Sequence, residues 1–164
     1  MNERGTQLQE TANSQISELI ALISTQGEAA LRRHCPGREK LGDGTVAACA
    51  MHTADNYHRI AGFVQGQRGG GHTRIAKVLH RHGEDKHQDN YRADNIDLPA
   101  LLDRLSAGRP ALSMLADLTE AQLDTVPPAS EMKFCDGQRT LQQIVTNLLN
   151  HQSHQLEALR TAIT

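Results

Sequence analysis

Apolar residues recur at spacings of three, four and seven in four long stretches of the chain, a pattern typical of amphipathic helices. The four stretches are residues 7–33, 45–65, 98–115 and the segment that begins at Thr140. Pro36 and Gly37 end the first stretch, and Pro110 should kink or interrupt the third. No alternation of apolar and polar residues persists for more than a few positions. The pattern therefore predicts an all-α protein.

Residues 67–95 interrupt this pattern with a long polar excursion between the second and third stretches. The excursion contains four histidines interleaved with Arg and Lys, namely His72, His80, His82 and His87. Because these cations repel a divalent ion, we expect a solvated loop or lid rather than a second metal site. The excursion leaves the second helix and can cover one end of the helices, so Tyr91 and Arg92 are candidate substrate contacts.

Length and composition predict one domain and exclude several classes of partner. A chain of 164 residues can bury one sizeable core, so we expect a single domain over residues 1–164. With no Trp, two Phe and two Tyr, that core must be aliphatic. The net charge of -2 gives no basic footprint for nucleic acid, and no apolar run approaches the roughly 18 residues of a membrane span. We expect a cytoplasmic protein that binds neither nucleic acid nor membrane.

Histidines on two separate helices are the first candidate site. His52 stands alone in the second stretch, whereas His151 and His154 lie in the last. Facing side chains from different helices can converge on one ion, which is a simple way for a helical bundle to build a metal site. The sequence therefore predicts a small metal-binding helical protein.

Residues that flank His52 are candidate substrate or second-layer contacts. Cys49, one turn earlier, is a soft ligand, a reactive thiol or, as we favour, a small buried hydrophobic residue. Asp55 and Asn56, one turn later, can orient a ligand or bind water, although plain helix-surface positions also explain them. The three cysteines, Cys35, Cys49 and Cys135, cannot all pair and lack CxxC spacing, so neither a disulfide framework nor a thiolate zinc site is indicated.

The order of these features resembles a known family over most of the chain. Residues 101–124, the loop that ends at Asp136 and Gly137, and the His-bearing last helix resemble the DinB/YfiT-like superfamily. Residues 46–63, with His52 and Asp55 in a His-x-x-Asp setting, resemble its second helix. The resemblance implies an up-down-down-up four-helix bundle. It also implies zinc or nickel, held by one His of the second helix and a His-x-x-x-His pair of the last.

The resemblance places that last pair of ligands on His151 and Gln155, so an amide stands where the family has imidazole. At about 100° per residue, Gln155 lies within roughly 60° of the apolar stripe of its helix, whereas His154 points far outside it. We expect His52, His151 and Gln155 to be the metal ligands, with His154 solvated or a backup ligand. An amide oxygen binds zinc less tightly than imidazole, which predicts weaker binding, a different metal or no metal.

The resemblance implies a metal-dependent hydrolase or a thiol transferase, with a small thiol as co-substrate, acting on a small reactive metabolite. A bound ion would act as a Lewis acid that lowers the pKa of water or of the thiol. Two alternatives stay open. One is a non-catalytic protein that binds or sequesters a small molecule, and the other is a structural homodimer with a degenerate metal site.

Overall fold

The computed structural model describes residues 2–68 and 91–164, and every regular element in these two ranges is helical. An isolated β-bridge pairs His34 with Thr45. The elements are α1 (Glu3–Gln26), α2 (Glu28–Leu31), α3 (Val46–Arg68), η2 (Ala93–Asn95), α5 (Leu98–Ala111), η3 (Ser113–Asp117), α6 (Glu120–Asp124) and α7 (Leu141–Ile163). The predicted all-α class is confirmed.

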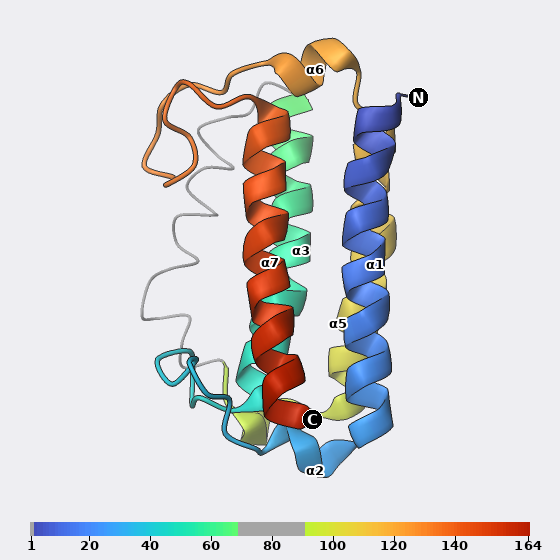
Figure 1. Cartoon of the computed structure of the whole chain (residues 1–164), viewed down its shortest axis with the longest axis vertical. Coiled ribbons are helices and arrows are strands. Elements are labelled where there is room, and N and C mark those ends of the chain that lie inside the picture. The colour runs from blue at the N-terminus through green and yellow to red at the C-terminus, as the bar shows by residue number, and fades with distance from the viewer. Residues whose placement is uncertain (1, 69–90) are drawn as a thin grey trace.

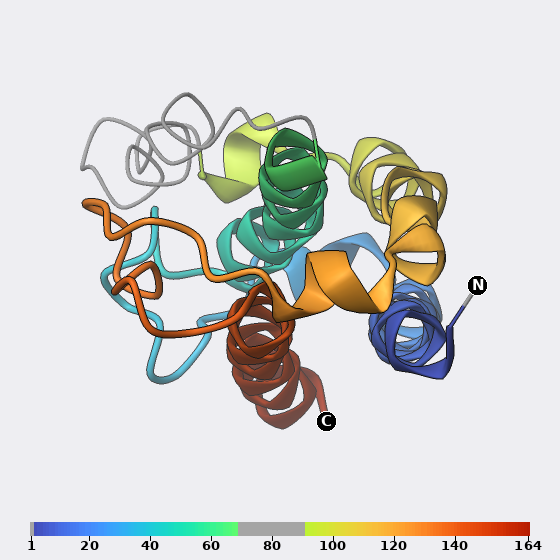
Figure 2. The ribbon, with the colours of Figure 1, turned by 90° about the horizontal axis from the view of Figure 1, so that it is seen from above.

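Four long helices lie side by side along the length of the molecule (Figure 1). α1 packs against α5 and α7, and α3 also packs against α5 and α7. α1 and α7 run in one direction, whereas α3 and α5 run in the opposite direction (Figures 1 and 2). At one end of the helices α6 leads the chain across from the α5 side to α7, and at the other end α2 lies between α1 and α3.

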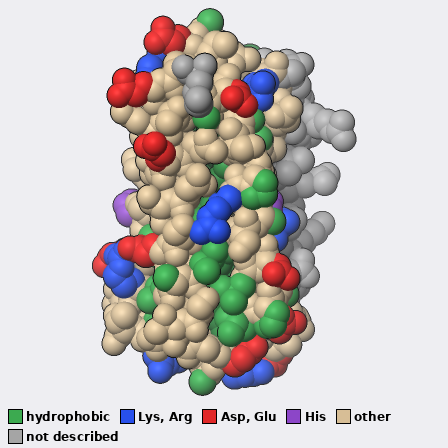
Figure 3. Space-filling model, turned by 90° about the vertical axis from the view of Figure 1, so that its right-hand side faces the viewer, with side chains coloured by type: hydrophobic (Ala, Val, Ile, Leu, Met, Phe, Trp, Pro, Cys, Tyr) green, Lys and Arg blue, Asp and Glu red, His purple; other side chains and the backbone are tan. Residues whose placement is uncertain are grey.

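The interior is aliphatic, as its composition predicts. Tyr57 and Phe63 are the largest fully buried side chains, and most of the others are Leu, Ile, Val and Ala. Buried amides cross between the helices: Gln15 Nε2 of α1 donates to the Leu149 carbonyl of α7 at 3.0 Å, and Tyr57 donates to Gln15 Oε1 at 2.8 Å. Figure 3, on the side of α1 and α5, shows hydrophobic side chains gathered in the lower half of that face.

The first predicted helix differs most from the sequence expectation. The first stretch, predicted as one helix over residues 7–33, is divided into α1 and α2, because Gly27 adopts the left-handed φ of 76°. α7 begins directly after Thr140, where the sequence predicts it, and Thr140 forms a capping box with Gln143. Pro110 lies in the last turn of α5, where the α-helix gives way to η3.

Part of the predicted excursion lies outside the described residues. This includes the four histidines His72, His80, His82 and His87. Tyr91 and Arg92 are described and precede η2. In the described ranges, no helix has the length and apolar character needed to cross a membrane.

Two helical glycines provide a matched test of this packing. A Cβ added at Gly5 of α1 would overlap the Leu115 carbonyl oxygen, whereas one added at Gly62 of α3 would meet no heavy atom within 4 Å. We expect Gly5→Ala to lower the free energy of unfolding by about 1–3 kcal/mol. Gly62→Ala should raise it by about 0.5–1 kcal/mol, because Ala favours the helix. Urea denaturation measures both, and equal stability of the two variants would contradict this packing.

Candidate functional site

His52 of α3 and Gln155 of α7 line the same open pocket. The pocket has a volume of about 410 Å³, and the remaining wall is the loop that precedes α3. Its lining residues are Gly37, Arg38, Glu39, Lys40, Leu41, His52 and Gln155. Two of the three predicted ligands therefore meet at one site.

Backbone hydrogen bonds hold the loop over this site. The Cys35 amide donates to the Gly44 carbonyl and the Val46 amide to the Arg33 carbonyl, each at 2.8 Å. These two bonds flank the bridge between His34 and Thr45 and close the loop at the first turn of α3.

The loop is also attached to the segment that precedes η2. The Asp43 amide donates to the Tyr91 carbonyl at 2.9 Å. Gly42, at a φ of 56°, lies so near Tyr91 that a Cβ would overlap the Tyr91 carbonyl oxygen. The pocket wall is thus fixed at its base and along one side.

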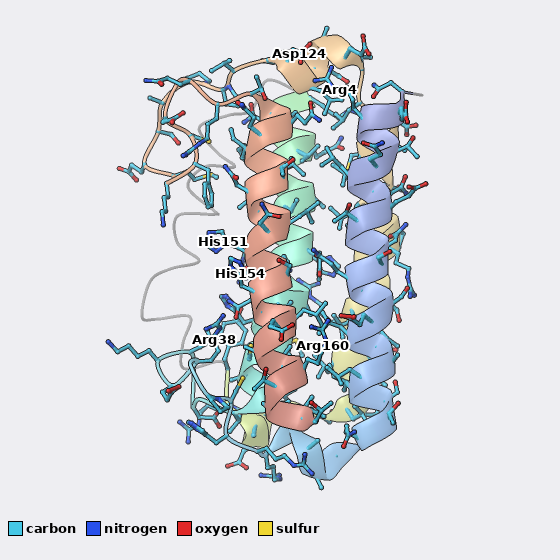
Figure 4. The ribbon with its side chains drawn as sticks, viewed as in Figure 1. Arg4, Arg38, Asp124, His151, His154 and Arg160 are labelled. Carbon is cyan, nitrogen blue, oxygen red and sulfur yellow. The ribbon has the colours of Figure 1, made fainter. Side chains whose placement is uncertain are left out.

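Arg38 places a positive charge in the pocket and joins the loop to α7. Its Nε donates to Gln155 Oε1, its Nη2 to the His154 carbonyl at 3.4 Å, and its Nη1 to the Gly37 carbonyl at 2.9 Å. All three acceptors are neutral oxygens. Figure 4 shows Arg38 below His151 and His154, on the same side of α7.

His52 is a neutral imidazole at neutral pH. Burial lowers its pKa to about 4, and the charges of Arg59 and Arg38 act in the same direction, while Asp55 opposes them. The ring contacts Tyr91 edge to face, with centroids 5.5 Å apart.

Three of the predicted substrate contacts form hydrogen bonds with protein side chains near His52. These residues are Asp55, Asn56 and Tyr91. Tyr91 donates to Asp55 Oδ2 at 2.8 Å, and Arg104 Nε donates to the other carboxylate oxygen at 2.9 Å. Asn56 donates to Gln152 Oε1 at 3.1 Å. These groups support the wall of the pocket but do not line it. Arg92, another of the five predicted contacts, is exposed.

His151 lies apart from this pocket. Its exposed ring contacts Phe134 of the preceding loop at a centroid distance of 5.2 Å and His154 at 6.2 Å. Partial desolvation, followed by the charges of Lys133 and His154, lowers the pKa of His151. His154 is exposed, as the helical register predicts.

Cys49 is fully buried, as we favoured, but its thiol also has a polar contact. Its Sγ donates to Gln155 Oε1 at 3.6 Å, so the amide oxygen accepts from both Cys49 and Arg38. The role of Arg38 could not be predicted from the sequence, because a loop residue carries no periodic signal. The nearest clue is Arg38 after Pro36 and Gly37, where the chain turns back.

The donor set does not fit a divalent ion as it is arranged. The acceptor oxygen of Gln155 is bound to the Arg38 guanidinium, which repels a cation, and His151 points to Phe134. In the described ranges, no group of three or more His, Cys, Asp or Glu side chains is placed to hold a metal.

Comparisons with protein-family models, with curated proteins and with solved structures found no match. The DinB-like assignment therefore stays a prediction from the sequence.

The pKa of His52 predicts how stability depends on pH. Unfolded His52 titrates near 6.5 and folded His52 near 4, so the unfolded chain binds the proton first as the pH falls. We expect the contribution of His52 to the free energy of unfolding to be fully present above about pH 6.5. Below that pH the free energy of unfolding should decrease, by up to about 3 kcal/mol at about pH 4. His52→Gln should remove this component of the slope in urea denaturation, whereas exposed His154→Gln should keep it. Identical slopes for wild type and His52→Gln would contradict the prediction.

Proposed function

We propose that the chain is a DinB-like four-helix bundle whose pocket at His52 binds a small, negatively charged molecule without a metal. The directions of α1, α3, α5 and α7 support the up-down-down-up topology that the sequence resemblance implies (Figure 1). The meeting of His52 and Gln155 at one pocket supports a ligand site where that family has its functional residues.

The observation that carries the proposal is the Arg38 guanidinium at Gln155. A guanidinium presents five N–H donors, and Arg38 donates only to neutral oxygens among the described residues, so its charge is not neutralised by a carboxylate there. The lining also contains Lys40 and one carboxylate, Glu39, so its cations outnumber its anions. A carboxylate or phosphate group is the chemistry that these donors recognise most strongly.

The remaining lining is consistent with binding rather than nucleophilic catalysis. The volume of about 410 Å³ is in the range of small-molecule sites. His52 offers a neutral imidazole, which can donate or accept a hydrogen bond without adding charge. The function would be to bind or sequester a small acidic metabolite.

A metal-dependent hydrolase or thiol transferase is the second candidate. The observation that favours it is the neutral state of His52, because a metal binds imidazole in that form. This candidate requires Arg38 to leave Gln155. The predicted homodimer stays a prediction, which sedimentation of the intact protein can test.

A change at Arg38 tests the binding proposal. We propose thermal denaturation with inorganic phosphate and a panel of small carboxylates, in the presence of EDTA. A bound anion at a hundred times its dissociation constant should stabilise the protein by about 2.7 kcal/mol. Arg38→Met keeps the aliphatic stem and removes the charge, and should weaken binding of the same anion at least about tenfold. Exposed Lys133→Met is the matched control and should bind as wild type does. Equal affinity in Arg38→Met would overturn the role of Arg38.

Zinc and nickel binding separate the two candidates. Under the first, equilibrium dialysis should find no stoichiometric ion on the wild-type protein, and anion binding should be the same with and without EDTA. About one ion per chain, lost in His52→Ala and bound more tightly in Gln155→His, would replace the first candidate by the second.

A further inference from the structure

Cys35 and Cys49 belong to different elements of the fold, a loop and a helix, but the fold brings them together next to the pocket. Cys35 lies in the loop before α3, where its amide donates to the Gly44 carbonyl at 2.8 Å. Cys49 lies in the first turns of α3, and its amide donates to the Thr45 carbonyl at 3.1 Å. Because His34 is bridged to Thr45, the loop holds Cys35 beside the start of the helix.

The two thiols also face the same part of α7. Cys35 Sγ lies 3.9 Å from the Ala158 carbonyl oxygen, and Cys49 Sγ lies 3.6 Å from Gln155 Oε1. Gln155 and Ala158 are one turn apart on α7. Both sulfurs are therefore on one side of the junction between the loop, α3 and α7.

Each thiol is a neighbour of the other. The Cys49 thiol lowers the pKa of Cys35, and the Cys35 thiol, together with burial, raises the pKa of Cys49. Both side chains are 0% exposed, and both are free thiols. Two buried sulfurs with no other reactive role in the proposed function can form a bond without disturbing the surface.

We propose that Cys35 and Cys49 form a reversible dithiol–disulfide pair that is oxidised by a hydroperoxide and acts on the adjacent pocket. In the first step the loop before α3 opens to admit the hydroperoxide and the Cys35 sulfur attacks it, so an S–O bond forms, the O–O bond breaks and an alcohol or water leaves. In the second step the Cys49 sulfur attacks the sulfenic sulfur, an S–S bond forms and water leaves. The dithiol loses two electrons, which reduce the hydroperoxide, and a small thiol reverses the change by exchange.

The disulfide would change the pocket through Gln155. In the reduced protein Gln155 Oε1 accepts from both Arg38 and the Cys49 thiol. Oxidation removes the thiol donor and ties the loop covalently to α3, so the loop residues of the pocket lose freedom relative to His52. The oxidation itself does not require the proposed anion binding, so the two proposals fail separately.

The experiment maps thiols in the intact protein before and after hydrogen peroxide. Remaining thiols are alkylated in denaturant, and the digest is analysed by mass spectrometry. We expect a linked Cys35–Cys49 peptide that has lost two hydrogens, with Cys135 alkylated, and complete return of three alkylated cysteines after reduction with dithiothreitol. Three alkylated cysteines after peroxide treatment, or linkage through Cys135, would overturn the proposal.

Single substitutions complete the test. Cys135→Ser should form the linkage at the wild-type rate, whereas Cys35→Ser should leave Cys49 alkylated under the same peroxide. Circular dichroism checks that each variant is folded. If Cys35→Ser does not fold, the wild-type and Cys135→Ser peptide maps still decide between linkage and its absence.

Discussion

The register between α3 and α7 is the constraint on which the candidate site depends, and a buried amide fixes it. Gln152 of α7 is 1% exposed; its Nε2 donates to the Thr53 carbonyl of α3 at 2.7 Å, and its Oε1 accepts from Asn56. An unpartnered buried amide costs a few kcal/mol, which opposes sliding of one helix along the other. Gln155 lies one turn beyond Gln152, and this register brings it to Cys49 of α3.

The loop before α3 then completes the site, because it is attached to each neighbouring element separately. Its backbone is closed by the bridge between His34 and Thr45, and Asp43 is bonded to Tyr91. Arg38 adds the bond to α7. These contacts are polar and lie at the edge of an aliphatic core, so the core supplies most of the stability while the loop determines the shape of the pocket.

The sequence predicted the helices better than the site, for physical reasons. Apolar periodicity reports which face of a helix is buried, so the four long helices and the inward position of Gln155 could be predicted. It does not report which loop closes over that face. The role of Arg38 and the proximity of Cys35 to Cys49 could therefore not be predicted. His151 occupies the position that the resemblance indicates, yet its ring lies against Phe134, which no periodic pattern predicts.

The side-chain amide of Gln155 suits this position because its oxygen accepts two hydrogen bonds. A carbonyl-type oxygen has two lone pairs, so it can accept from the Arg38 guanidinium and from the Cys49 thiol at once. A neutral imidazole has one acceptor nitrogen and could hold only one of these donors. In the proposed DinB-like alignment Gln155 stands at a metal-ligand position, where its amide instead joins a cation and a thiol. The positive charge comes from Arg38, which this amide holds in the pocket, and that charge supports the proposal that the site binds an anion.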